Sequence, residues 1–384
     1  MTAIADLRGP RIASRPRVER IPLGQVLSRG EASWERLRAQ TPLASPFSSW
    51  AWHEAWSATA PTEERDDAFA IATADEHGEM TALLPLATRR VTFRRMPANA
   101  LTWAIGDVGC PDHLDVLMKP GTALDNVAAL LDTLEWDLLQ LDGLVEGAVG
   151  VRALQAALEA RGMTTELRPL WICPYIDLPQ TWNEYLAARS SQRRETIRRR
   201  ERALSKNEGA AVTFYGPESH DEAWHHLLRL HDSRWQGDGA FDARLIALHR
   251  RFASLLAPSG RAWLTTIDIK GEAVAAWYGF VDRRTLHYYQ AGRAPEWSKS
   301  GVGGVHLGTM MQRAIAQGLE RFDFLRGDEP YKADWATAHR FTYQLLAFRR
   351  SARGRMLRLA DRIGSLRDRV AKRTEPTGPA EEPA

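Results

Sequence analysis

Two segments in the last third of the 384-residue chain carry residues suited to chemistry. Ser298–Gly304 (SKSGVGG) follows an apolar strand pattern and precedes a helical pattern over Val305–Leu319. Glycines let the backbone approach an anion closely, and the first turn of a helix offers unpaired N–H groups with a favourable dipole. Lys299 adds a mobile positive charge. The loop is therefore predicted to bind phosphate, beside a second strand that carries charged residues, Arg321–Lys332 (RFDFLRGDEPYK).

The spacing of the glycines narrows the class of ligand. The loop fits neither G-x-G-x-x-G nor G-x-x-x-x-G-K-[ST], which disfavours a dinucleotide site and a P-loop nucleotide site. No H-E-x-x-H metal motif and no G-x-S-x-G nucleophile motif is present. A phosphate-bearing ligand of another kind remains, and coenzyme A is the leading candidate.

Several short motifs together carry a family resemblance. They are Tyr289–Gly292 (YQAG), Ser300–Gly301, Phe322–Lys332 (FDFLRGDEPYK), Trp335, Cys173–Pro179 (CPYIDLP) and Ser191–Arg194 (SQRR). With them, residues 213–350 resemble the GNAT acyltransferase fold. Residues 45–350 resemble the cellulose-biosynthesis acetyltransferases (CelD/BcsL type), and the paired layout resembles Fem-type peptidyltransferases. The chain departs from this pattern at Lys299–Gly301, where relatives tend to have a Ser-Pro-Gly turn.

The resemblance implies an acyl-CoA site between two strands that splay apart. Unpaired N–H groups of the first strand would hold the pantetheine arm and polarise the thioester carbonyl, a form of oxyanion stabilisation. No metal is implied, and the co-substrate is acetyl-CoA or another acyl-CoA. The expected cofactor-binding residues are Gln290, Ala291, Gly292, Lys299, Ser300, Gly301, Val302, Gly303 and Gly304.

The resemblance also places the chemistry on the charged strand end. Transfer needs a base that takes a proton from an amine or hydroxyl, and an acid that protonates the leaving thiolate. Asp328 and Glu329 are candidate bases, and Tyr331 is the candidate acid. Lys332 and Arg326 would orient an anionic group or offset developing charge. The alternative for the whole group is a salt-bridged loop.

The order of predicted elements indicates an α/β (α+β) protein with two halves of one design. Strands alternate with helices in each half, which predicts tandem GNAT-like domains, each a mixed, mainly antiparallel sheet flanked by helices. The predicted boundaries are an N-terminal extension (1–44), a first GNAT-like domain (45–179), a basic linker helix (180–210), a second GNAT domain with the acyl-CoA site (211–350), and a basic amphipathic helix with a disordered tail (351–384).

Two basic segments flank the second half. The run 189–206 holds eight basic and two acidic residues, and we weigh a solvated linker helix, an anion-binding wall and nucleic-acid binding. A net charge of +3 disfavours a dedicated nucleic-acid protein.

After Arg350, an apolar stripe alternates with arginines. This helix is expected to dock on the protein itself, with weak contact to an anionic membrane as the alternative. The stripe comprises Met356, Leu359, Ile363, Leu366 and Val370.

Composition favours a cytoplasmic location. The protein could also contact the inner face of the membrane peripherally. The two cysteines, Cys110 and Cys173, have no metal-ligand spacing and fit a reducing compartment. Residues 1–17 show no signal-peptide pattern, and no run of 18 apolar residues occurs. We expect most of the 14 tryptophans in hydrophobic cores. The alternative is that some of them line a groove for a sugar or lipid-linked acceptor.

The predicted function is acyl-CoA-dependent N- or O-acylation of a sugar, lipid-linked or exopolysaccharide precursor. The cellulose or exopolysaccharide context rests on the resemblance alone. Two alternatives stay open: a Fem-like transferase that uses aminoacyl-tRNA, and a non-catalytic scaffold at a polysaccharide synthase. The acceptor, the acyl chain and the oligomeric state are left undetermined by the sequence.

Overall fold

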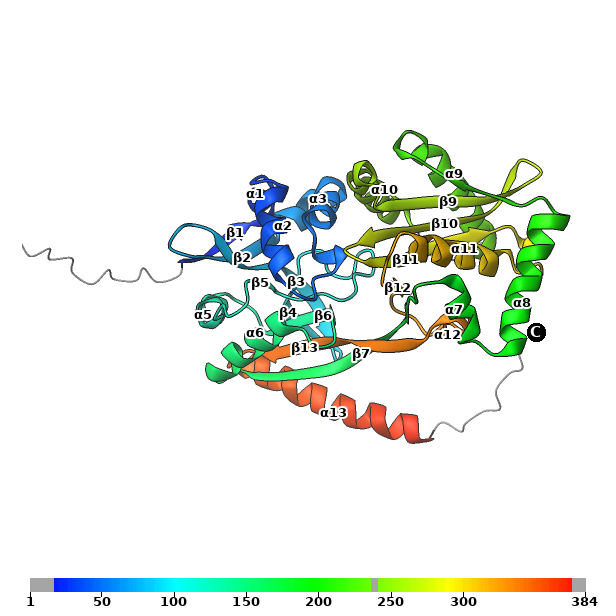
Figure 1. Cartoon of the computed structure of the whole chain (residues 1–384). Coiled ribbons are helices and arrows are strands. Elements are labelled where there is room, and N and C mark those ends of the chain that lie inside the picture. The colour runs from blue at the N-terminus through cyan, green and yellow to red at the C-terminus, as the bar shows by residue number, and fades with distance from the viewer. Residues whose placement is uncertain (1–16, 236–240, 375–384) are drawn as a thin grey trace, which may run out of the picture.

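A computed structural model describes residues 17–235 and 241–374 of the chain (Figure 1). The described strands form one sheet in the order β1-β2-β3-β4-β6-β13-β7-β12-β11-β10-β9-β8, and β5 pairs with β3. The strands of its first half are β1 (Arg17–Pro22), β2 (Ala68–Ala74), β3 (Met80–Phe93), β4 (Met96–Trp103), β5 (Leu117–Met118), β6 (Leu138–Leu144) and β7 (Thr164–Asp177). Those of the second are β8 (Ala211–Phe214), β9 (Ala262–Ile269), β10 (Glu272–Asp282), β11 (Thr285–Arg293), β12 (Arg321–Asp323) and β13 (Ala338–Phe348).

Helices pack along both halves of this sheet (Figure 1). The first half has α1 (Leu23–Leu27), α2 (Glu31–Gln40), α3 (Trp50–Thr59), α4 (Thr62–Asp66), α5 (Asp125–Thr133) and α6 (Val149–Ala160). Then follow α7 (Trp182–Ala187), α8 (Ser191–Arg202), α9 (His220–Trp235), α10 (Ala243–Leu256), α11 (Val302–Ala316), α12 (Pro330–Trp335) and α13 (Ala352–Thr374).

The strand order repeats, which confirms the predicted tandem design. From one edge, the path is β1-β2-β3-β4-β6, and from the other it is β8-β9-β10-β11-β12. In each half the fourth and fifth of these strands run parallel, β4 with β6 and β11 with β12, and the other neighbours run antiparallel. The last strand of each half is exchanged: β13 pairs with β6 of the first half, and β7 pairs with β12 of the second. The two exchanged strands pair with each other at the centre.

The structure places the predicted domain segments as follows. Residues 17–44 of the predicted extension contribute β1, α1 and α2 to the first half, and residues 1–16 lie outside the described residues. The predicted linker helix forms as α8, with a π-turn after it at Ala203–Asn207. Leu186 of α7, Ile197 of α8 and Leu204 of the π-turn are buried. The predicted disordered tail lies beyond residue 374, outside the described range.

The helix after the glycine loop starts three residues earlier than predicted. α11 begins at Val302 and ends at Ala316, so Gly303 and Gly304 belong to its first turn. Gly301 precedes the helix with a φ of 76°, a left-handed conformation that glycine adopts without strain. Sequence periodicity counted these glycines as loop because glycine is a poor helix former. The correction moves the helix N-terminus onto the glycines themselves.

The tryptophans are mostly core residues, as expected. Trp52 and Trp56 are fully buried, and the ring of Trp52 packs against His249 and Phe252 of α10, while Trp50, Trp182 and Trp297 are partly buried. The side chain of Trp235 lies outside the described set. Both cysteines are free thiols; Cys110 is exposed and Cys173 is buried. Within residues 17–235 and 241–374, no helix is long and apolar enough to cross a membrane.

A buried ion pair joins the two halves on the face that carries α2. Arg38 of α2 donates two hydrogen bonds to the Asp282 carboxylate at the end of β10, at 2.9 and 2.8 Å. Burial alone would raise the pKa of Asp282, but the hydrogen bonds and charge of Arg38 lower it. A lowered pKa means that the pair stabilises the fold above the pKa of the unfolded carboxyl. This contribution is lost as the pH falls through the folded pKa.

We expect Arg38→Met to lower the free energy of unfolding by about 3–5 kcal/mol at pH 7, because it removes the hydrogen-bonded partner of the buried Asp282 carboxylate, whose remaining ion pair with Arg261 is longer, at 3.9 Å. The difference from the parent should shrink as the pH falls through the lowered pKa of Asp282 in the folded parent, because the carboxyl is then protonated in both proteins. Urea unfolding over a pH series measures this difference. Arg36→Met, at an exposed position on the same helix, is the matched control. A loss equal to that of the control would show that the pair is not required.

Candidate functional site

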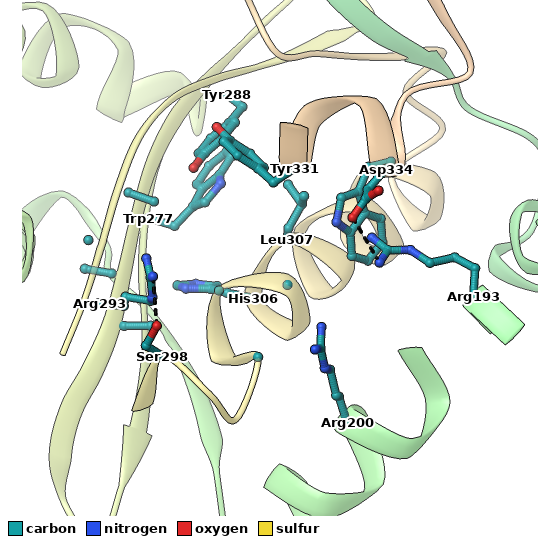
Figure 2. Close-up of a pocket in the computed structure, with 18 residues that line it drawn as sticks. Arg193, Arg200, Trp277, Tyr288, Arg293, Ser298, His306, Leu307, Tyr331 and Asp334 are labelled. Atoms are coloured by element: carbon teal, nitrogen blue, oxygen red, sulfur yellow. Dashed lines mark hydrogen bonds and ion pairs between the residues drawn. The ribbon is translucent and has the colours of Figure 1, made fainter. Parts of the chain in front are cut away.

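The main pocket of interest lies where α11 meets the second half of the sheet (Figure 2). Its volume is about 270 Å³. Strands β10 and β11 form one wall, the N-terminus of α11 lies against it, and α8 and α12 face it from the other side (Figure 2). The lining residues are Arg193, Arg200, Ala275, Ala276, Trp277, Tyr288, Ala291, Gly292, Arg293, Ser298, Gly301, Gly303, Gly304, His306, Leu307, Tyr331, Asp334 and Trp335.

The glycines leave the N-terminus of α11 open to this pocket. No side chain caps the helix at Gly301, so its first N–H groups keep their hydrogen-bonding capacity and the positive end of the helix dipole faces the cavity. A Cβ atom on Gly303 would meet only the Arg293 side chain, at 4.0 Å. The Cβ atom would therefore project into the pocket and reduce its volume. A glycine at this position therefore keeps space for a ligand beside the helix end.

The strands beside the helix splay as the sequence predicts for this fold. β11 pairs with β12 only over Thr285–His287 and Arg321–Asp323, and β11 then continues alone on this side to Arg293. Gly292 is required on the other face, because a Cβ atom there would collide with the backbone of α9 at Leu230 and His231. The open edge of β11 thus forms a slot that leads from the helix N-terminus into the protein.

One N–H group in this slot already has a partner. The backbone N–H of Ala291 donates to the side-chain Oε1 of Gln290, at 3.0 Å. A carbonyl bound at this position would have to displace the Gln290 amide. Gln290 therefore lies beside the slot as a competing acceptor for the strand edge.

Arginine side chains from separate elements converge on the helix end. Arg200 of α8 approaches so closely that a Cβ atom on Gly301 would lie 2.5 Å from its Cδ atom and 2.7 Å from its Nε atom. Its guanidinium forms no hydrogen bond or ion pair among the described residues. Arg293 of β11 donates to the hydroxyl of Ser298, at 3.0 Å. Figure 2 shows both side chains directed toward the cavity. A guanidinium beside the positive end of a helix is an arrangement that a bound anion would stabilise.

A third arginine borders the pocket on the side of α12. Arg193 pairs with Asp334, at 3.3 Å, and its guanidinium lies over the Trp335 ring, 5.1 Å from the ring centroid. Arg193 and Arg200 both come from the predicted basic linker run. Of its three candidate uses, the anion-binding wall agrees best with their position. α8 is thus a wall of the pocket rather than a free linker.

The structure brings together five of the nine predicted cofactor-binding residues. The backbone at Ala291, Gly292, Gly301, Gly303 and Gly304 lines the pocket. Val302 is fully buried in the core under α11. Ser300 turns its hydroxyl to the Trp297 carbonyl, at 2.6 Å, and Lys299 is exposed outside the lining.

Of the five predicted catalytic residues, Tyr331 is the one that lines the pocket. Its ring lies 6.4 Å from the ring of Tyr288, edge to face. Asp328 and Glu329 are exposed outside the lining. Glu329 pairs with Lys332 at 2.8 Å, and Lys332 also donates to the Arg326 carbonyl, at 2.6 Å. This part of the rim therefore contains the salt-bridged loop that the sequence left as an alternative.

Arg326 binds the first half of the protein. Its backbone N–H and Nε donate to the buried Asp112 carboxylate, at 2.8 and 2.7 Å. The same guanidinium donates to Asp107 and to the Pro111 carbonyl, and lies 3.5 Å above the centroid of the Trp171 ring. These contacts account for its charge within the protein. They tie the loop after β12 to the segment 107–112 of the first half.

His306 is a pocket residue that sequence inspection did not single out. Burial lowers its pKa to about 3, so the imidazole is neutral at physiological pH. Its Nε2 atom lies 2.7 Å from the Thr265 hydroxyl of β9. A neutral, buried ring held by this hydrogen bond positions α11 against the sheet and adds no charge to the pocket.

Sequence inspection also missed several other lining residues. Arg293 and Tyr288 lie beside the YQAG motif, but they are five residues apart, so simple alternation would place them on opposite faces of the strand. The irregularity in pairing that skips Tyr289 brings both to the pocket. The sequence marks Arg200 as part of the basic run 189–206. It does not show which of the eight basic side chains in this run faces the site. Asp334 sits one helical turn after Tyr331, next to Trp335, which the sequence analysis named among the family motifs without giving it a role in the site. Trp277, from the preceding strand, left no comparable signal.

The comparisons with known proteins agree with this geometry. Residues 191–333, which contain α8, the pocket strands and most of α12, match the family described as "Acetyltransferase (GNAT) domain". No curated protein matches the chain significantly. Among the residues that the structure describes, no group of three or more His, Cys, Asp or Glu side chains is arranged to hold a metal ion.

Solved structures share the fold across both halves. FemX superposes with a TM-score of 0.56 at 14% identity, covering 83% of this chain and 95% of FemX. L-PGS from Bacillus licheniformis gives 0.53 at 13% identity, with coverages of 89% and 97%. The C-terminal domain of a protein assigned as a lysylphosphatidylglycerol synthetase, from Agrobacterium fabrum, gives 0.50 at 10%, with coverages of 88% and 97%. The repeated strand order gives the chain a tandem GNAT-like fold, and residues 191–333, which form α8 and most of the second half, match the acetyltransferase (GNAT) domain.

Proposed function

We propose that the chain transfers an acyl group from acyl-CoA, with acetyl-CoA as the expected donor, to an amine or hydroxyl. The observation that carries this proposal is the convergence of Arg200 with the uncapped N-terminus of α11 at the head of the β11 slot. The pyrophosphate of the donor would bind at the helix end, where N–H groups and guanidinium groups meet. The pantetheine arm would then follow the open edge of β11 toward Tyr331.

The reaction needs little from any single side chain once the donor is positioned. The acceptor nitrogen or oxygen attacks the thioester carbonyl carbon, the new C–N or C–O bond forms, and the C–S bond breaks. The acceptor loses its proton, and the departing thiolate takes one. Tyr331, which lines the pocket, is the proposed acid for the thiolate. Glu329 and Asp328 remain proposed bases at the exposed rim.

The acceptor is proposed from the resemblance to the cellulose-biosynthesis acetyltransferases. It would be a sugar, lipid-linked or exopolysaccharide precursor that carries a free amine or hydroxyl. Tryptophan supports this class in one respect: Trp277 and Trp335 border the pocket, and aromatic faces suit carbohydrate and apolar ligands alike.

A second candidate, transfer of an aminoacyl group from tRNA, is favoured by the fold. FemX and the two lysylphosphatidylglycerol synthetase-type structures cover most of this chain at low identity. The basic helix α8 offers exposed arginines outside the pocket, among them Arg198 and Arg199, which a polynucleotide could contact. Acyl-CoA and aminoacyl-tRNA both carry phosphate groups. They differ in how much of the protein surface they would contact.

Thermal unfolding with each donor separates these candidates. A ligand present at 100 times its Kd stabilises the folded state by about 2.7 kcal/mol. We expect acetyl-CoA to raise the unfolding temperature by a few degrees and bulk tRNA at equal phosphate concentration to leave it unchanged. Stabilisation by tRNA without any by acetyl-CoA would favour the aminoacyl transferase. If neither acetyl-CoA nor tRNA raised the unfolding temperature, the result would favour the non-catalytic scaffold.

We expect Arg200→Gln to weaken coenzyme A binding about tenfold to a hundredfold, because hydrogen bonds to charged groups contribute about 1.5–3 kcal/mol. Arg199→Gln removes the same charge from an exposed position on the same helix and should leave the affinity almost unchanged. Isothermal titration calorimetry with both variants measures the difference. Equal losses would indicate general electrostatic attraction instead of a contact in the pocket.

For the chemical step, we expect Tyr331→Phe to lower kcat about a hundredfold while the Kd for acetyl-CoA stays within about twofold. Glu329→Gln breaks the ion pair with Lys332 outside the pocket and serves as the comparison. A similar fall in kcat for both variants would support the predicted base at Glu329. A change confined to KM would assign Tyr331 to substrate binding.

A further inference from the structure

The outer face of α13 carries an apolar stripe without a partner among the described residues. Met356, Leu359 and Ile363 are spaced by three and four residues, so they lie along one side of the helix. Their exposures are 52%, 60% and 45%. Few other large apolar side chains are this exposed among those described, and the rest are scattered over separate elements at Leu43, Val149, Phe214 and Phe341.

The helix is held to the protein by its other face. Leu357 is fully buried in a small cluster with Leu346 and Phe348 of β13. Gly354 and Gly364 lie on this inner side: a Cβ atom on Gly364 would come within 2.9 Å of Arg94, and one on Gly354 would collide with the Arg349 carbonyl. The helix therefore docks on the protein as expected, through Leu357 and the side that carries the two glycines, and the apolar stripe points away from this contact.

Charge is divided between the two faces in the same way. Asp361, the one acidic residue of segment 352–365, is 2% exposed and pairs with Arg94 and Arg168, each at 3.0 Å. Arg355 and Arg362 are exposed beside the apolar stripe. Within this segment, the outward face thus combines apolar side chains with positive charge and presents no acidic group.

We propose that this face of α13 binds an anionic lipid surface. Arginines beside the stripe would contact lipid phosphates, while the three apolar side chains enter the boundary between headgroups and acyl chains. A second copy of the chain fits less well, because a symmetric contact would bring the arginines of the two helices together. The remaining side of the helix is fixed to the sheet, so binding orients the whole protein along one helix face. This proposal is independent of the donor at the pocket.

The test uses the full chain and vesicles of phosphatidylcholine with 30% phosphatidylglycerol, compared with phosphatidylcholine alone, in a flotation assay. We expect binding to the anionic vesicles at low salt and at least a tenfold loss in 0.5 M NaCl, since salt screens the charge contribution. Leu359→Ser with Ile363→Ser should reduce the partition coefficient at least tenfold. The matched control, Leu43→Ser with Val149→Ser, removes equally exposed apolar groups elsewhere and should bind like the parent.

A second pair of variants isolates the charge. Arg355→Gln with Arg362→Gln should also reduce binding at least tenfold, whereas Arg29→Gln with Arg36→Gln, at exposed positions on the first half, should not. All four variants alter exposed side chains, and unchanged unfolding temperatures would confirm intact folds. Equal binding of helix and control variants, or absence of binding by the parent, would overturn the proposal. So would a dimer, seen by analytical ultracentrifugation, that the Leu359 and Ile363 changes dissociate.

Discussion

The pairing of β7 with β13 is the constraint on which the rest of the molecule depends. These strands are each the last of their half, and their antiparallel register runs from Ala338 opposite Tyr175 to Phe348 opposite Thr164. Each then pairs outward with the other half, β13 with β6 and β7 with β12. One sheet therefore continues from the first half into the second (Figure 1). Since α12 lies between β12 and β13 in the chain, this exchange also fixes the helix that carries Tyr331.

Buried charges at the junction complete this connection. Asp323, at the end of β12, is fully buried and pairs with Arg340 of β13, while His113 of the first half lies 3.1 Å away. Burial alone would raise the pKa of Asp323, but His113 and Arg340 hold it well below its usual value. Arg326 and Asp112 form a comparable pair nearby. Such pairs add little net stability over apolar packing, but removing one partner is costly, so they specify how the halves fit together.

The pocket uses charge in the opposite way. At the junction each arginine meets a carboxylate, whereas Arg200 meets the N-terminus of α11, which is itself electropositive. Asp334 is the acidic lining residue, and it already pairs with Arg193. The net positive potential at the helix end is therefore left for a ligand. This contrast separates Arg326 and Lys332, whose charges are satisfied within the protein, from the arginines of the pocket wall.

Much of the fold and part of the site followed from the sequence alone. Regular periodicity located most long helices and strands of both halves, and the glycine motif located the turn before α11 that lines the pocket. Both signals are local, because backbone preferences and amphipathic patterns are encoded by neighbouring residues. Short strands such as β5 and β8 lacked that signal. The exchange of β7 and β13, the inward use of Arg326, and the choice of Arg200 among its basic neighbours were decided only by the tertiary structure. Each depends on which distant segment lies opposite, and a hydrogen bond or ion pair over such a separation leaves no local pattern in the sequence.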